Sequence, residues 1–231
     1  MDIDLKSIEE KLGVTFRDKN FLIEALTHRS YLNEHPEHPT DHNERLEFLG
    51  DAVIELVVTE ELFVQYPKKP EGELTNWRAA LVNAHMLSDV CRELGVEPHL
   101  LLSRGESKET GKARAYILAN AFEALVGAMY LDQGWETAKD FQHRVLLPKL
   151  PVILETGAHI DAKSRFQELA QERTGITPSY RVLREEGPDH AKSFTVGIFL
   201  KNEQVAVGLG TSKQEAQMDA AANALIAKGW T

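Results

Sequence analysis

Three carboxylates stand close together in the stretch HNERLEFLGDAV at residues 42–53. Glu44, Glu47 and Asp51 are spaced i, i+3 and i+7, so on a helix their side chains fall within roughly 60° of one another. Like charges on one face repel each other, and a divalent cation bound among them would offset that cost. The pattern therefore has two interpretations, a cation site or an ordinary solvated acidic face.

A second polar edge occurs later in the chain, where Asn120 and Glu123 are spaced i, i+3 on a predicted helix. If the two helices face each other, Glu47, Asp51, Asn120 and Glu123 offer four oxygen ligands. Mg²⁺ prefers hard oxygens and keeps several waters, so four protein oxygens or fewer suit it. Activation of water by Mg²⁺ for attack on phosphorus would require no serine or cysteine nucleophile.

The helix that carries the first acids must be held by its apolar side. Phe48 lies on the acidic side, where it is either simply exposed or enters a partner subunit. Gly50 costs about 1 kcal/mol relative to alanine in mid-helix and usually indicates close approach of another backbone. The residues on the side opposite the acids are Leu46, Leu49, Val53, Leu56 and Val57.

Helical patterns continue to about residue 150, and no strand pattern precedes that position. The predicted helices cover residues 2–12, 19–27, 43–63, 75–82, 84–94, 113–131 and 137–145, with a loop at residues 31–40. Three histidines around that loop, His35, His38 and His42, would be zinc ligands or solvent-facing side chains.

The pattern changes after Pro148, Pro151 and Gly157. Helices are predicted at residues 162–173 and 212–228, and short alternating strands at residues 180–184, 193–200 and 204–208. The sequence therefore predicts an all-α domain at residues 1–150, a linker at residues 151–160 and an α-β-β-β-α domain at residues 161–231.

The charge is unevenly distributed between these parts. The net charge is −10, yet residues 158–231 hold nine basic and nine acidic side chains, so the whole excess lies in residues 1–157. An acidic first domain suits cation binding, although it must leave local basic surface if it is to meet a phosphate backbone.

The single cysteine, Cys91, excludes an intrachain disulfide and lies in an apolar-periodic stretch, which favours a buried thiol. The N-terminus lacks the apolar region of a signal peptide, and no apolar run approaches the ~20 residues of a membrane span. Gly208–Ser212 does not have P-loop spacing. These features favour a cytoplasmic protein with no membrane partner and no nucleotide cofactor.

HNERLEFLGDAV resembles the signature stretch of the ribonuclease III family. Supporting matches follow in the family's order: LTHRSY, PEGELT, RAALVN, ILANAFEALVGAMYLD and a C-terminal segment similar to a double-stranded-RNA-binding domain. The resemblance covers almost all 231 residues. It implies a helical nuclease domain followed by an RNA-binding domain.

The resemblance also assigns roles to the acids. Glu47, Asp51 and Glu123 correspond to metal ligands, and the family has an aspartate where this chain has Asn120. Glu44 and Glu71 correspond to further acids that line the cleavage site; with Asp51 and Glu123 they form the expected catalytic set. An amide oxygen can still ligate Mg²⁺, but it carries no charge and cannot act as a base. Asn120 is thus either a tolerated ligand or a sign of a weakened enzyme.

In the second domain the resemblance implies contacts with 2′-hydroxyls and phosphates of A-form RNA. Gln214 and Gln217 stand where the family usually has lysines, which predicts weaker binding and a shallower salt dependence. The expected RNA-binding residues are Ser164, Gln167, Glu168, His190, Lys192, Ser212 and Lys213.

The resulting expectation is a Mg²⁺-dependent endoribonuclease, with Mn²⁺ as a possible substitute, that processes double-stranded rRNA and mRNA precursors. A homodimer formed through Phe48 and Gly50 would cut both strands with a stagger, leaving 5′-phosphates, 3′-hydroxyls and 3′ overhangs. The alternatives are a double-stranded-RNA-binding dimer that no longer cuts and a ribosome-associated relative. The retained acids favour the enzyme, because a pure binder has no reason to keep them.

Overall fold

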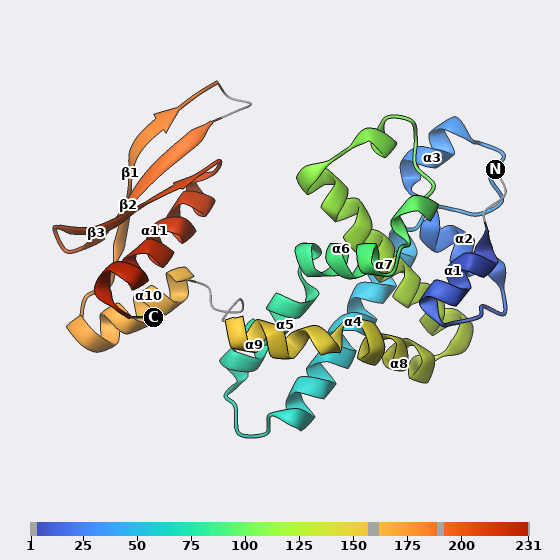
Figure 1. Ribbon diagram of the computed structural model, residues 1–231, viewed down its shortest axis with the longest axis horizontal. Coiled ribbons are helices and arrows are strands. Elements are labelled where there is room, and N and C mark those ends of the chain that lie inside the picture. Colours follow the sequence, from blue (N-terminus) through green and yellow to red (C-terminus); the bar gives the residue numbers. More distant parts are fainter. Residues whose placement is uncertain (1–3, 157–161, 189–191, 231) are drawn as a thin grey trace. The chain divides into compact units, whose positions relative to one another are not determined.

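The computed structural model describes residues 4–156, 162–188 and 192–230 (Figure 1). The chain divides into two compact units, Met1–His159 and Ile160–Thr231. The described part of the first unit is helical, and the second has the order α-β-β-β-α. The predicted fold class is therefore confirmed.

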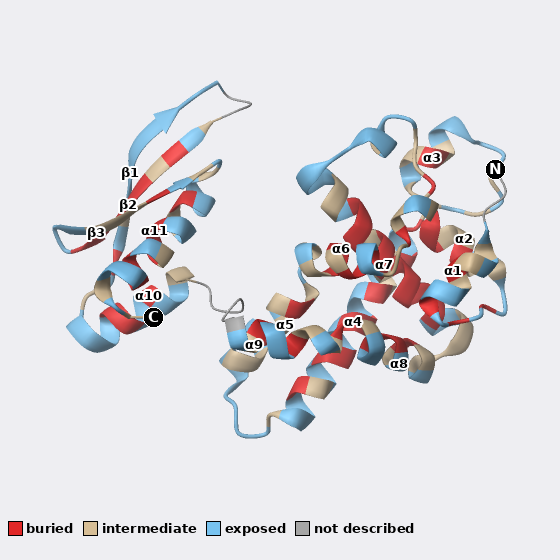
Figure 2. Ribbon diagram, in the orientation of Figure 1, coloured by how far each residue is buried: buried red, intermediate tan, exposed pale blue. Residues whose placement is uncertain are grey.

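The first unit is built around one central helix. The helices of this unit are α1 (Leu5–Leu12), α2 (Lys19–Leu26), α3 (Arg29–Glu34), α4 (Glu44–Gln65), α5 (Glu71–Val82), α6 (Ala84–Glu93), α7 (Gly111–Gln133), α8 (Trp135–Val145) and α9 (Leu150–Thr156), with short 3-10 turns at Glu97–His99, Glu106–Lys108 and Leu147–Lys149. Most of α7 between Ile117 and Met129 is buried (Figure 2). A helix that is apolar nearly all round must lie inside its domain, and α7 does so.

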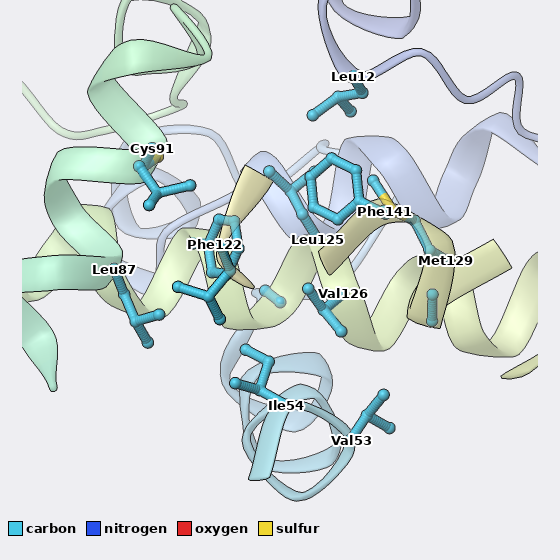
Figure 3. Packing of buried hydrophobic residues seen from close by; sticks show 14 of the residues in the cluster. Leu12, Val53, Ile54, Leu87, Cys91, Phe122, Leu125, Val126, Met129 and Phe141 are labelled. Atoms are coloured by element: carbon cyan, nitrogen blue, oxygen red, sulfur yellow. The ribbon is translucent and has the colours of Figure 1, made fainter. Parts of the chain in front are cut away.

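The core forms where α4, α6 and α8 pack on α7. Figure 3 shows Val53 and Ile54 of α4 directed toward Phe122 and Val126 of α7. Phe141 of α8 lies beside Phe122, with ring centroids 5.9 Å apart. Each fully buried side chain of this size contributes about 1.5–3 kcal/mol. This packing fixes the two helices that carry the predicted acids.

One predicted loop contains a helix. α3 covers Arg29–Glu34 and so occupies the start of the expected loop at residues 31–40. The side chain of His28 makes this possible, because its Nδ1 accepts a hydrogen bond from the backbone N–H of Ser30 (3.2 Å) and caps the first turn.

Another helix begins four residues earlier than predicted. α5 starts at Glu71, directly after Pro70, whose φ of −67° is compatible with a helix start. Thr75 therefore lies inside the helix and does not cap it. Its hydroxyl donates to Glu71 Oε1 (2.9 Å), one turn back.

The predicted linker at residues 151–160 begins too early. α9 covers Leu150–Thr156, and Leu150 and Ile153 are buried in the core of the first unit. Pro151 does not interrupt this helix, because proline is tolerated in a first turn, where its missing N–H would have no helical partner. Residues 157–161 lie outside the described residues.

The second unit is a three-stranded antiparallel sheet covered by two helices. Its elements are α10 (Ala162–Thr174), β1 (Ser179–Glu186), β2 (Ser193–Leu200), β3 (Glu203–Gly210) and α11 (Lys213–Lys228), with strand order β1-β2-β3. Phe166 of α10 and Ile198 of β2 belong to its core. A Cβ added at Gly208 would lie 2.0 Å from the backbone nitrogen of Ala220, so α11 packs directly on β3. Alanines on α11 permit this close approach.

Candidate active site and RNA-binding residues

The backbones of α4 and α7 meet at two glycines. A Cβ added at Gly50 would lie 1.8 Å from the carbonyl oxygen of Glu123, and one added at Gly127 would lie 2.2 Å from that of Leu46. The close backbone approach predicted for Gly50 is therefore confirmed. Its assignment to a dimer interface is wrong, because Gly50 is buried against α7 of its own chain.

This crossing brings the acids of the two helices into electrostatic contact. Burial, followed by the charges of Asp51 and Glu47, raises the pKa of Glu123 from 4.5 to about 8. Burial, followed by Glu44 and Asp51, also raises the pKa of Glu47. Glu47 and Glu123, both half-buried, are therefore influenced by neighbouring acids, whereas Glu44 and Asp51 are themselves exposed. Asn120, half-buried, stands one turn before Glu123 on the same helix.

Glu44 lies at the first turn of α4 and, among the described residues, is the only one of these acids in an ion pair with a basic side chain. Arg29 Nη1 donates to Glu44 Oε1 at 3.0 Å. The Nδ1 atom of His42 lies 3.8 Å from Glu44 Oε2, which is too long for a hydrogen bond. The predicted acids thus extend from a paired, exposed side chain at Glu44 to a half-buried one at Glu123.

The donor chemistry fits a hard divalent cation. Carboxylate and amide oxygens such as those of Glu47, Asp51, Asn120 and Glu123 are the ligands that Mg²⁺ prefers. A cation would offset the repulsion that adds to burial in raising the pKa of Glu123. Among the described residues, no three His, Cys, Asp or Glu side chains are gathered in a metal-holding group, so in the single chain Glu47, Asp51 and Glu123 do not form a closed ligand set. The same finding gives no support to zinc binding by His35, His38 and His42.

Glu71 lies in a different place. It lines a cavity of about 460 Å³ between α4 and α5, together with Thr59, Phe63 and Arg78. Thr59 follows Asp51 by eight residues, a distance of about 12 Å along a helix. Glu71 is therefore not placed with the other predicted acids inside a single chain.

An apolar stripe runs along the exposed side of α4. The exposed fractions are 82% for Phe48, 57% for Leu56 and 72% for Phe63. The expectation that Leu56 lies on the buried side is wrong, whereas Leu46, Val53 and Val57 are buried as predicted. Leu56 lies toward the edge of the apolar face, and the neighbouring elements leave that edge uncovered.

The predicted RNA-binding residues of α10 share one surface. Ser164, Gln167 and Glu168 line a shallow pocket with Gln171 and Thr177. The spacing of these residues places them on one side of the helix, opposite the buried Phe166 and Ala170. His190 lies outside the described residues.

The remaining predicted RNA-binding residues flank β2 and α11. Lys192 pairs with Glu185 (Nζ to Oε1, 2.9 Å). Ser212 is the N-cap of α11, and its Oγ accepts from Glu215 N at 3.2 Å. The Glu215 carboxylate accepts a hydrogen bond from Thr211 N (3.0 Å), the residue before the N-cap, whereas a capping box would bond the N-cap N–H itself. Lys213 is exposed in the first turn of α11.

Comparison with known proteins identifies the family to which both parts of the chain are similar. Residues 18–150 match the family model described as Ribonuclease-III-like, and residues 162–227 match the double-stranded RNA binding motif. The chain belongs to the ribonuclease III family. Ribonuclease 3 of Bacillus cereus (strain G9842) is 45% identical over 223 residues, covering 95% of this chain and 89% of that protein, and ribonuclease 3 of Bacillus anthracis (strain CDC 684 / NRRL 3495) gives the same values.

The first unit is also similar to solved nuclease domains of ribonuclease III. The nuclease domain of ribonuclease III from Campylobacter jejuni is 40% identical, with a TM-score of 0.58, and the match covers 64% of this chain and 99% of that one. As a ribonuclease III, this protein is an endoribonuclease for double-stranded RNA, with a nuclease domain and an RNA-binding motif in one chain. The family is generally metal-dependent.

Two residues of this ribonuclease III were not singled out from its sequence. Gly127 completes the α4–α7 crossing, and a small residue inside a fully buried helix could have indicated it. Arg29, within the LTHRSY motif, pairs with Glu44, but nothing in the local spacing connects two residues 15 positions apart.

Within the described residues, no helix is long and apolar enough to cross a membrane.

Proposed function

We propose that this ribonuclease III uses Mg²⁺, with Mn²⁺ as a substitute, to cut double-stranded rRNA and mRNA precursors in the cytoplasm. The products are short duplexes with 5′-phosphates, 3′-hydroxyls and 3′ overhangs. The observation that supports metal dependence is the close α4–α7 crossing at Gly50, which sets Glu123 beside Asp51 and Glu47. Burial, and then the charges of these two acids, raises the pKa of Glu123 to about 8. Such repulsion is relieved when a cation binds among the acids.

Glu47, Asp51, Asn120 and Glu123 are the proposed ligands. When bound, Mg²⁺ would lower the pKa of a coordinated water and offset negative charge on the phosphoryl group under attack. Asp51 on α4 and Glu123 on α7 would hold the cation from two sides. The Gly50–Gly127 crossing fixes how closely these two helices approach. Glu44 and Glu71 line the path of the RNA strand.

Asn120 is proposed as a working ligand. Its amide oxygen keeps a hard donor at this position while removing one negative charge. The consequence is a weaker attraction for Mg²⁺ and less repulsion in the metal-free protein. The same residue is the observation that favours a second candidate, a double-stranded-RNA-binding protein that no longer cuts.

A symmetric homodimer is proposed through the exposed stripe of α4, formed by Phe48, Leu56 and Phe63. Three large apolar side chains at 57–82% exposure on one helix face are typical of an interface. A two-fold axis across this helix would pair the stripe with itself. The same two-fold axis would bring Glu71 of one subunit near Glu47 and Asp51 of the other subunit. The Campylobacter jejuni structure is described as having a region involved in dimer formation.

The RNA contacts proposed for the second domain are Ser164, Gln167 and Glu168 on α10, His190 and Lys192 near the start of β2, and Ser212 and Lys213 at α11. The start of α11 supplies free N–H groups and a favourable dipole for a phosphate. With Gln214 and Gln217 in place of lysines, fewer counterions are released on binding.

The test is cleavage of long double-stranded RNA by the full chain, with Mg²⁺ or with EDTA, resolved on a denaturing gel. Short staggered duplexes formed only with Mg²⁺ support the proposal, and Glu123→Gln should abolish them. RNA that stays intact with Mg²⁺ but shifts on a native gel supports the non-cutting binder instead. In that case, cleavage restored by Asn120→Asp would identify Asn120 as the cause.

A further inference from the structure

The segment Thr27–Ser30 is anchored on both sides. Asn43 N donates to Thr27 O (2.9 Å), which joins the segment to the start of α4. His28 N donates to Leu101 O (3.0 Å), and Ser103 N donates to Ser30 Oγ (3.1 Å). The backbone at Arg29 is therefore held in place, and its side chain reaches the first turn of α4.

Arg29 uses little of its bonding capacity. Its guanidinium has five N–H donors, one of which is bonded to Glu44 Oε1 at 3.0 Å. The Arg29 side chain is 66% exposed and that of Glu44 45%. An ion pair so open to water contributes little to stability, so exchanging its partner costs little.

The acids next to the Arg29–Glu44 pair repel a negatively charged substrate. Glu44, Glu47 and Asp51 lie on one side of α4, and their negative charge repels RNA phosphates. A cation held by the acids would offset charge at the scissile phosphate alone. On the proposed function, in which Glu44 lines the path of the RNA strand, the neighbouring phosphates pass Glu44, which pairs with Arg29.

We propose that Arg29 is a substrate-binding residue of this ribonuclease: when RNA binds, its guanidinium exchanges Glu44 for a backbone phosphate that flanks the scissile one. A planar fork of N–H donors matches two phosphate oxygens. The exchange moves no proton and breaks no covalent bond. After it, Glu44 keeps His42 on its other side, 3.8 Å from Oε2. The inference rests on the proposed function of the adjacent acids.

The experiment compares Arg29→Gln and Arg29→Lys in the full-length chain. Arg92→Gln is the matched control, since Arg92 is also an exposed arginine in an ion pair, with Asp89 of its own helix (2.9 Å). Steady-state cleavage of double-stranded RNA with Mg²⁺ gives KM and kcat. Arg29→Gln should raise KM about five- to tenfold and leave kcat within about twofold. Arg29→Lys should recover part of the loss, and Arg92→Gln should behave as the parent.

A second measurement does not need cleavage. In the Glu123→Gln background, RNA affinity is measured against salt concentration, and Arg29→Gln should lower the slope of log K against log salt by about one. The salt dependence of binding can be measured even if the parent protein does not cut RNA. Failure of the proposed nuclease activity is therefore distinguishable from failure of the proposed RNA contact of Arg29.

Two outcomes would overturn the assignment. An unchanged KM and salt slope, with only a lower melting temperature, would make the Arg29–Glu44 pair purely structural. A fall in kcat without a change in KM or salt slope would mean that Arg29 acts on Glu44 and does not touch RNA.

Discussion

The main chain of Glu123 occupies the space that a side chain at Gly50 would need. A Cβ at Gly50 would lie 1.8 Å from the carbonyl oxygen of Glu123. The same crossing places the Glu123 side chain within range of the charges of Asp51 and Glu47. One packing contact thus both closes the core and sets the chemistry of the acids.

Gly50→Ala should therefore destabilise the nuclease domain strongly. The added methyl meets backbone atoms that cannot rotate away, so we expect a loss of about 3 kcal/mol or more in the free energy of unfolding. Gly72→Ala is the matched control, because a Cβ there meets nothing within 4 Å. It should be neutral or stabilising by up to about 1 kcal/mol. Urea denaturation of both variants measures this, and equal midpoints would contradict the close crossing.

The half-buried carboxylate of Glu123 should make the metal-free protein less stable as the pH rises. Its folded pKa of about 8 lies above the ordinary value of 4.5, so between these values the folded state holds a proton that the unfolded state has released. Stability from this group is present below pH 4.5 and is lost as the pH approaches 8. Above pH 8, without divalent cations, Glu123→Gln should be more stable than the parent by on the order of 1–2 kcal/mol, discounted for solvent screening.

Thermal unfolding across this pH range, in EDTA, measures the difference. Glu109→Gln, at an exposed loop carboxylate, is the control and should follow the parent at every pH. A parallel pair of curves for Glu123→Gln and the parent would mean that neither burial nor the neighbouring acids raise the pKa of Glu123 in the folded state.

Asn120→Asp should tighten Mg²⁺ binding while lowering the stability of the metal-free protein. The added charge strengthens attraction for the cation, and about a tenfold gain in affinity corresponds to roughly 1.4 kcal/mol. Without metal, the same charge adds to the repulsion around Glu123. Isothermal titration calorimetry with Mg²⁺ and melting in EDTA test both halves. A gain in stability without metal would show that Asn120 stands apart from the acids.

Cys91 should be inert toward thiol reagents in the folded protein. Burial raises the pKa of its thiol from 9.0 to about 12, so almost none is thiolate near neutral pH, and the side chain is fully enclosed. Labelling with a chromogenic disulfide should be slow in buffer and complete in urea. Rapid native labelling would indicate local opening between α6 and α7.

Phe48→Asp should produce monomers in light scattering without a loss of helical structure, since the side chain is 82% exposed in the single chain. Val64→Asp is the control: Val64 is 68% exposed on the same helix but about 160° away in azimuth. It should remain dimeric. A dimer that survives Phe48→Asp would remove this stripe from the interface.

The amino-acid sequence by itself determined the two-domain order, the helical nature of the first unit and the acidic faces of α4 and α7. These features follow from local spacing, because residues three, four and seven positions apart share one side of a helix whatever surrounds it. The buried face of α7, with Leu118, Phe122, Leu125 and Met129, was predictable for the same reason.

Only the tertiary structure decided how those faces meet. The Gly50–Gly127 crossing, the separation of Glu71 from the other acids and the Arg29–Glu44 pair join residues far apart in the chain. Their positions depend on how all the helices pack at once. The raised pKa of Glu123 is likewise a property of the packed core, since burial is its largest cause and the neighbouring charges come from another helix.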